Sequence, residues 1–362
     1  MTKSKFKLND EIISNARENM YKLIDNLISL KMEDLETFEF PLDEPFGLEI
    51  VHGKALFYFI INFSSTNKNL ICMPPGAFNR HKRTSSGDLI KPPYFTRWSW
   101  YRFFEESVIT FADPMIFWDD DIKIGWMLGE KDDWYIETLS IIIQKLAKNQ
   151  GVLHDNILFF GSSGGGFISV CLATLIKNSK VVINNAQLSV LNYRPKLVNY
   201  ALDTASVEFD GMDKEKMKEE YSYRLNVIEL FEKENYAPDI TYYVNVKSKA
   251  DVCDHSIPFI AEHYNQSQFT RLTVIYYSEE KKVPHHPLPT TPTIHLIKAF
   301  AKNNLYNKKP ETEKTILKED KYLMQLKKEN KRLKRANSKM KNSRSWKITK
   351  PLRKLMNILR RK

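Results

Sequence analysis

Residues 156–168 join an apolar run, a turn rich in glycine and serine, and a pattern typical of a helix. The turn has the form Gly-x-Ser-x-Gly, with Gly161, Ser163 and Gly165 at its defined positions. Between a strand and a helix, this motif holds a serine in a sharp, strained turn where only small neighbours fit. The stretch therefore predicts that Ser163 is a nucleophile and that the backbone N–H of Gly164 is one oxyanion donor.

Other functions of a glycine-rich turn fit this stretch less well. A phosphate-binding loop needs a lysine where Phe167 stands. The glycine spacing of a dinucleotide-binding turn is absent. A tight strand-to-helix turn without any chemistry remains the alternative interpretation.

The rest of the chain alternates between strand-like and helix-like runs. The expected strands are residues 48–51, 55–63, 70–73, 108–111, 181–184, 240–246 and 271–277, and the expected helices are residues 10–36, 132–148, 257–266 and 293–302. This alternation predicts an α/β fold, in which helices cover both faces of a mainly parallel sheet and function lies at the carboxyl ends of its strands.

Composition shifts divide the chain into three parts. We expect an N-terminal helical segment (1–45), an α/β domain (46–305) and a basic tail (306–362). Within the domain, the highly charged helical stretch 210–236 is expected to be a cap or insertion.

A serine nucleophile needs a base, and the base needs an acidic group that orients it. In folds with this kind of elbow, the three follow one another in the chain as serine, acid and histidine. Asp251 and Asp254 come after one late strand, and we prefer Asp251 because it is first. His285 and His286 come after the last strand, and we prefer His285, with His286 as the alternative.

The loop after the strand at 70–73 is the expected source of a second oxyanion N–H. Gly76 would let the backbone approach a ligand closely. The amides of Ala77 and Phe78 are the candidates, and we choose Ala77. An ordinary Pro-Gly turn is the alternative.

A metal site is the rival chemistry for the late polar residues. Its ligands would come from Asp251, Asp254, His255, His285 and His286. These residues lack a tight ligand spacing such as His-Glu-x-x-His, and a metal site would leave the elbow unexplained. We therefore expect neither a metal nor another cofactor.

Several pieces of the chain together resemble a known group of proteins. The pieces are Ala112-Asp113-Pro114, Gly125-Trp126 with Gly129, residues 161–167, Asn185-Ala186-Gln187, residues 251–255 and residues 285–289. Residues 70–300 resemble α/β-hydrolase-fold proteins encoded with bacterial capsule and surface-glycan genes, and are similar to the acyltransferase-like component of the accessory Sec pathway. The resemblance implies an α/β-hydrolase-type fold, a Ser–Asp–His triad and ester or acetyl-transfer chemistry on a glycan. Gly165-Gly166 departs from the Ala-Gly expected there.

The positive charge of the chain is concentrated in its tail. Residues 321–362 hold 17 Lys and Arg and one acid, a local net charge of +16. Since the whole chain carries +11, the remainder is 11 − 16 = −5. A mildly acidic body argues against nucleic-acid binding by the domain, although RNA binding by the tail alone is an open alternative.

Two patterns in the tail indicate helices with partners. A seven-residue repeat predicts a short parallel coiled coil and hence a homodimer, with a single solvated helix as the alternative. Its seam would be formed by Ile316, Leu323, Leu326, Asn330, Leu333, Asn337 and Met340. Residues 351–362 predict a basic amphipathic helix suited to an anionic membrane surface. Residues 343–353 resemble the ends of many bacterial glycosyltransferases, which implies work on lipid-linked glycans.

These expectations combine into one functional hypothesis. The first eleven residues lack the apolar core of a secretory signal, and the three cysteines are widely spaced, so we expect a cytoplasmic protein peripheral to the membrane. It would be a serine-dependent acyltransferase or esterase acting on a surface-polysaccharide intermediate, with an acyl donor where acyl transfer occurs. The alternative is a non-catalytic assembly partner of a glycosyltransferase complex.

Overall fold

The computed structural model describes residues 5–264 and 271–305 of the chain. The coiled coil and the amphipathic helix expected within residues 306–362 lie outside the described residues. Among the described residues, no helix is long and apolar enough to span a bilayer.

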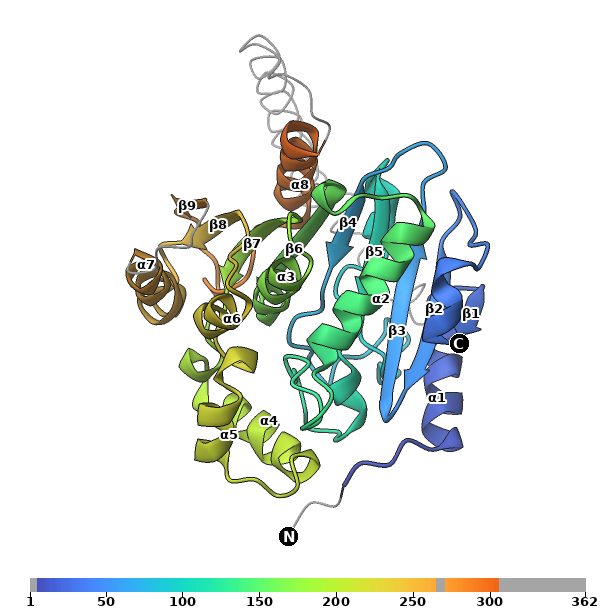
Figure 1. Cartoon of the computed structure of the whole chain (residues 1–362), viewed down its shortest axis with the longest axis horizontal. Helices are drawn as coiled ribbons and strands as arrows, with labels where there is room; N and C mark the ends of the chain where they lie inside the picture. The colour runs from blue at the N-terminus through green and yellow to red at the C-terminus, as the bar shows by residue number, and fades with distance from the viewer. Residues whose placement is uncertain (1–4, 265–270, 306–362) are drawn as a thin grey trace, which may run out of the picture. The chain divides into compact units, whose positions relative to one another are not determined.

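The described strands form one sheet in the order β1-β2-β3-β5-β4-β6-β7-β8-β9 (Figure 1). They are β1 (Leu27–Leu30), β2 (Phe46–His52), β3 (Ala55–Asn62), β4 (Leu70–Met73), β5 (Ser107–Phe111), β6 (Ile157–Ser163), β7 (Lys180–Ala186), β8 (Ile240–Asn245) and β9 (Leu272–Tyr277). Every neighbouring pair of these strands is parallel except β2–β3 and β3–β5, so β3 alone runs against the others. The expected mainly parallel sheet is confirmed.

Helices cover both faces of the sheet because its central strands are apolar on both sides. Successive side chains of β6 alternate, so that Phe159 packs in one core cluster and Phe160 in another. The first cluster includes residues of α2 (Tyr135–Asn149), α3 (Gly164–Leu175) and α6 (Val227–Glu234), which lie on one face (Figure 1). The second includes residues of α8 (Thr290–Asn304).

The prediction of a single helix over residues 10–36 is wrong. Helix α1 (Asp10–Tyr21) is followed by strand β1, which pairs parallel with β2, and by a 3₁₀ turn at Met32–Glu36. The apolar residues of this stretch fit a helical period, but the contact with β2 decides its conformation. A Cβ at Gly47 would lie 2.9 Å from Leu27 and 3.0 Å from Met20, so this glycine lets β1 and α1 approach the sheet.

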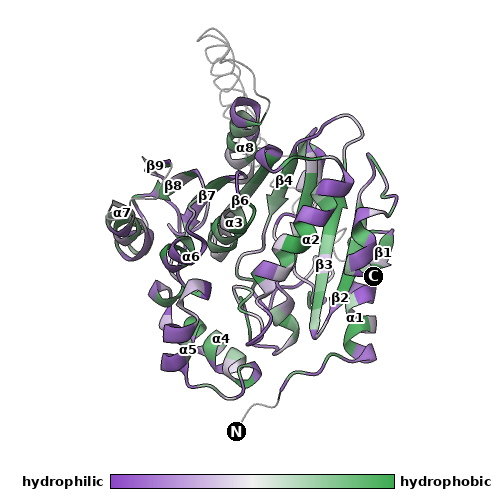
Figure 2. Ribbon diagram, viewed as in Figure 1, coloured by the Kyte–Doolittle hydropathy of each residue, from purple (hydrophilic) through white to green (hydrophobic). Residues whose placement is uncertain are grey.

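The helices inserted between β7 and β8 differ in their environment. Helix α6 contacts α3 and belongs to the layer over the sheet. Helices α4 (Pro195–Glu208) and α5 (Lys214–Glu220) lie beyond the ends of the strands (Figure 1), and α5 is mostly hydrophilic (Figure 2). The expected insertion at 210–236 is thus part of a longer segment that starts after β7 and passes beside the site described next.

Candidate active site

Ser163 lies at the turn between β6 and α3, with φ 55° and ψ −132°. This conformation is strained for a residue with a side chain. The glycines around it are required by close contacts, because a Cβ at Gly161 would lie 2.1 Å from the carbonyl oxygen of Gly165. A Cβ at Gly166 would lie 2.3 Å from that of Ala186 on β7. The Gly-x-Ser-x-Gly-Gly sequence therefore packs a helix closely against two strands and leaves the serine at the tip of the turn.

Two residues predicted from the sequence are joined to Ser163 by hydrogen bonds, His285 directly and Asp251 through His285. The Nε2 atom of His285 is 2.8 Å from Ser163 Oγ, and its Nδ1 atom is 2.7 Å from Asp251 Oδ1. Asp251 is 1% exposed and begins the π-helical turn Asp251–Ser256 that follows β8. Serine, histidine and aspartate thus form one hydrogen-bonded line at the carboxyl end of the sheet, in the geometry that activates a serine.

The alternative residues lie away from this line. Asp254 and His286 are both exposed. The backbone carbonyl of Asp254 accepts a hydrogen bond from Asn192, and that of His286 accepts one from Asn185. Among the described residues, no group of three or more His, Cys, Asp or Glu is placed to hold a metal ion.

Buried asparagines hold the loop that carries His285. The Nδ2 atom of Asn185 donates to the carbonyl of His285 at 3.2 Å. The side chain of Asn184 accepts from the amide of Leu288 at 2.7 Å, and that of Asn245 donates to the carbonyl of Pro284 at 3.2 Å. Because these amides come from the ends of β7 and β8, the strands themselves position the histidine.

Two further side chains at Ser163 were not among the predicted site residues. Gln187, which directly follows β7, donates from Nε2 to Ser163 Oγ at 2.9 Å. The ring of Tyr193 lies 6.0 Å from that of His285. Burial raises the pKa of Tyr193, while its interactions with Gln187 and Ser163 lower it. Asn185-Ala186-Gln187 was noted only as part of a resemblance, and no local pattern marks Tyr193.

The two expected oxyanion donors have different surroundings. Gly164 begins α3, and the first amides of a helix have no partner within it. The amide of Phe78 donates to the carbonyl of Lys123 at 2.9 Å, so it is occupied. Ala77 is exposed beside it, and the loop lies against the elbow, since a Cβ at Gly165 would be 2.7 Å from the carbonyl oxygen of Pro75. Ala77 stays the predicted second donor.

His255 lies one turn after Asp251 and is 3% exposed. Burial lowers its pKa to about 4, although the carboxylates of Asp251 and Asp254 oppose this. Neither His255 Nδ1 nor Asp251 Oδ2 has a hydrogen-bond partner among the described residues. His255 is therefore a neutral buried ring beside the acid of the site.

We expect this histidine to make the protein sensitive to acid. In the unfolded chain, His255 takes up a proton near its ordinary pKa of about 6.5. In the folded protein, its pKa is lowered to about 4, so it takes up the proton only at that lower pH. As the pH falls through this window the unfolded state binds the proton first, so the free energy of unfolding decreases by about 2–3 kcal/mol between pH 7 and 4.5. Denaturant unfolding at the two pH values measures this decrease.

A variant comparison isolates the contribution of His255. His255→Phe should lose clearly less stability between pH 7 and 4.5 than the wild type, whereas replacement of the exposed His81 should not change the loss. An equal loss in His255→Phe and wild type would assign the acid sensitivity to other groups.

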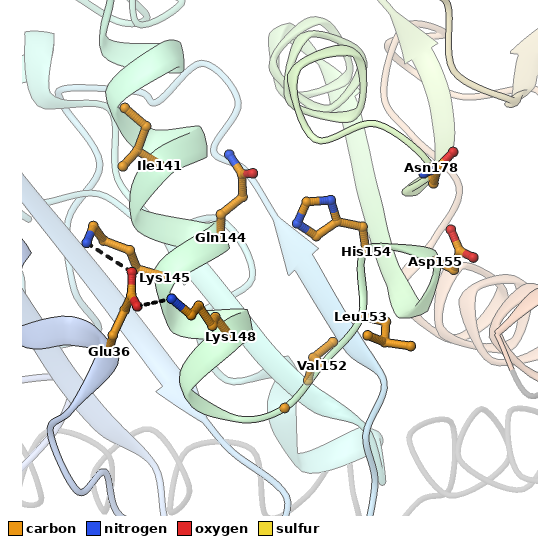
Figure 3. Close-up of a pocket in the computed structure, with 11 residues that line it drawn as sticks. Glu36, Ile141, Gln144, Lys145, Lys148, Val152, Leu153, His154, Asp155 and Asn178 are labelled. Carbon is orange, nitrogen blue, oxygen red and sulfur yellow. Dashed lines mark hydrogen bonds and ion pairs between the residues drawn. The ribbon is translucent and has the colours of Figure 1, made fainter.

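A second concave region lies at the opposite end of β6. It is an open pocket beside the last turns of α2, and Figure 3 shows Lys145, Lys148 and His154 around it, with Glu36 paired to both lysines. His154 precedes β6, whereas Ser163 ends it. Seven residues of strand span about 20 Å, so this pocket is separate from the serine.

The described fold was compared with known proteins. No family model and no curated protein matches the chain. The capsule O-acetyltransferase of Neisseria meningitidis serogroup A superposes with a TM-score of 0.53 at 14% identity, covering 75% of this chain and 99% of that one. A variant of that enzyme in complex with CoA gives the same values. An S-formylglutathione hydrolase from Agrobacterium tumefaciens gives a TM-score of 0.46 at 13% identity, over 69% of this chain and 91% of that one.

At 14% identity, the likeness to the acetyltransferase is evidence for the fold alone. Together with the sheet order and the strand–elbow–helix at Ser163, it shows that the described chain has an α/β-hydrolase fold. This confirms the fold class that the sequence resemblance implied.

Proposed function

We propose that the protein is a serine-dependent acyltransferase or esterase that acts on a bacterial surface glycan. The hydrogen-bonded line from Ser163 through His285 to Asp251 carries this proposal. A serine, a histidine and a buried carboxylate so arranged are suited to acyl chemistry, because the histidine can remove the serine proton and the carboxylate stabilises the imidazolium that forms.

The reaction proceeds in two halves. The Oγ atom of Ser163 attacks the acyl carbonyl carbon while its proton passes to Nε2 of His285. The carbonyl oxygen takes up the negative charge and is stabilised by the N–H groups of Gly164 and Ala77. The bond to the leaving group then breaks, and His285 returns the proton to that group. In the second half, water or a sugar hydroxyl gives its proton to His285 and attacks the acyl-serine. The bond between the acyl group and Oγ then breaks, and His285 returns the proton to Ser163 Oγ.

The glycan substrate is supported by two observations of different kinds. The sequence resembles proteins encoded with capsule and surface-glycan genes. The solved structure that superposes with a TM-score of 0.53 is a capsule O-acetyltransferase. The likeness to the accessory Sec component remains a prediction from the sequence.

Active-site labelling tests the proposed chemistry. The purified full-length protein should react with a fluorophosphonate probe, and the reaction should be lost in Ser163→Ala and strongly slowed in His285→Ala. His286→Ala is the matched control and should react like the wild type, because its side chain is exposed and outside the line. Failure of a folded wild-type protein to react, or reaction that persists in Ser163→Ala, would refute an activated Ser163.

The O-acetyl content of the surface polysaccharide tests the substrate. Cells that carry Ser163→Ala should produce a glycan with a different acetyl content from the wild type. An unchanged glycan, together with a loss of glycan when the whole protein is deleted, would instead support an assembly role.

We also propose that residues 306–362 hold the enzyme at an anionic membrane surface. The support is the local charge of +16 over residues 321–362 and the amphipathic pattern that ends the chain. A protein that ends at residue 305 should keep fluorophosphonate labelling but no longer sediment with anionic vesicles. Equal sedimentation of the two forms would contradict the proposal.

A further inference from the structure

Three stretches of the chain converge behind Ser163. They are the loop after β5, the turn around Trp126 and the end of β7. The serine–histidine–aspartate line contains none of them, yet one sequence of hydrogen bonds and packing contacts joins them to Ser163 Oγ.

The series of contacts behind Ser163 begins at Asp113, whose side chain is 3% exposed. Its Oδ1 atom accepts from the amide of Met115 at 3.0 Å, and its Oδ2 atom accepts from the amide of Gly125 at 2.8 Å and that of Met127 at 3.4 Å. One carboxylate thus ties the loop after β5 to the turn at residues 125–127. Trp126 and Met127 have φ values of 51° and 53°, a left-handed conformation that persists only where surrounding contacts hold it.

The turn aims the indole of Trp126 at Gln187. Trp126 is fully buried, and its Nε1 atom donates to Oε1 of Gln187 at 2.9 Å. Gly164 has no Cβ at the point where one would lie 3.1 Å from that indole nitrogen and 3.3 Å from Gln187 Oε1. The side chains of Trp126 and Gln187 therefore fill the space beneath the elbow.

The indole determines which end of the Gln187 amide faces the serine. An indole N–H can only donate, so the oxygen of the amide must face it. The NH₂ group must then face Ser163 Oγ, where the structure places it at 2.9 Å. The backbone amide of Gln187 also donates to the carbonyl of Ser163 at 3.1 Å, which holds the two residues in register.

The place of Gln187 in the sheet separates it from Ala77, the expected second oxyanion donor. In the strand order, β6 lies between β4 and β7. The loop with Ala77 follows β4, whereas Gln187 follows β7, so the two approach Ser163 from opposite sides. In the structure, the NH₂ group of Gln187 meets the serine oxygen itself.

We propose that Gln187 is a positioning residue for Ser163, held by Trp126 and the turn that Asp113 ties down. The inference rests on the proposed function. Because the NH₂ group that faces Ser163 donates and does not accept, the hydroxyl proton of Ser163 cannot point to it and is directed toward Nε2 of His285. The same N–H stabilises negative charge on Oγ during attack and when Oγ leaves the acyl group.

The experiment measures the reaction rate per competent site in the full-length protein. Active-site titration with the fluorophosphonate probe counts the sites that react, and the labelling rate constant and the kcat and KM for an aryl acetate are then expressed per counted site. This separates positioning from simple loss of folded protein, because misfolding lowers the count while a misplaced serine lowers the rate.

Two variants and one control are compared. Gln187→Met keeps the length and removes the donor, and we expect a per-site labelling rate and kcat about 10- to 100-fold lower with KM unchanged. Trp126→Phe keeps Gln187 but frees its amide to turn, and we expect a smaller loss of about 3- to 10-fold. Gln144→Met makes the same replacement on α2, far from Ser163, and should match the wild type.

The outcomes distinguish the inference from the function on which it rests. A wild-type rate per site in Gln187→Met would overturn the positioning role and leave the serine mechanism intact. If Gln187→Met does not fold, a wild-type rate per site in Trp126→Phe would overturn it. Absence of Ser163-dependent labelling in the wild type would instead show that the proposed function itself is wrong.

Discussion

Replacing Asp251 by asparagine is expected to lower kcat for an ester substrate by about 10³- to 10⁴-fold, with little change in fold. The aspartate accepts a hydrogen bond from Nδ1 of His285, which leaves Nε2 without a proton and able to take that of Ser163. An asparagine can turn its NH₂ group toward Nδ1, so that the ring carries its proton on Nε2. This tautomer cannot act as the base, and the buried site no longer stabilises an imidazolium.

Asp254→Asn is the matched control for this prediction. Asp254 is exposed on the same π-helical turn, and the structure places its backbone carbonyl, not its carboxylate, in a hydrogen bond with Asn192. Steady-state kinetics of both variants, with circular dichroism to verify folding, measure the difference. Similar rates for Asp251→Asn and wild type, or a large loss in Asp254→Asn, would show that the acid has been wrongly assigned.

Gly161→Ala is expected to destabilise the protein by about 3 kcal/mol or more and to abolish labelling of Ser163. The added Cβ would lie 2.1 Å from the carbonyl oxygen of Gly165 and 2.5 Å from Oγ of Ser169. Because the first contact is with backbone of α3, it can be relieved only by moving the helix away from β6. That movement would displace Ser163 from His285.

Gly76→Ala provides the comparison, because a Cβ there would meet nothing closer than 3.8 Å. Its free energy of unfolding should stay within about 0.5 kcal/mol of the wild-type value. Chemical denaturation of the three proteins measures both values. Equal stability of Gly161→Ala and wild type would mean that the elbow is looser than these contacts indicate.

Much of the fold could be predicted because the relevant signals are local. Strands buried on both faces are continuous apolar runs, and the expected runs at 55–63 and 70–73 correspond to β3 and β4. The segment at 10–36 was mispredicted because its apolar residues fit a helical period, while pairing with β2 makes residues 27–30 a strand. The spacing of apolar residues within one segment carries no information about the strand with which that segment pairs.

The candidate site, too, could be predicted only in part from the sequence. Ser163 was predicted to be a nucleophile from five consecutive residues, and Asp251 and His285 were predicted to be its partners from their order after two strands. The choice between neighbouring aspartates and histidines could be argued only from order, since it depends on where the loops lead. Asn185 and Asn245, which hold the histidine loop, are ordinary polar residues in the sequence until β7 and β8 lie side by side.

The sequence by itself determined the strand–turn–helix at Ser163, the alternation of strands and helices, and the separation of a basic tail from an acidic body. These follow from steric limits within a few residues, from side-chain periodicity and from charge. Only the tertiary structure decided which polar groups meet at Ser163. Gln187 and the indole that orients it are 61 residues apart in the chain, and the direction of the amide follows from a contact that exists only in the folded protein.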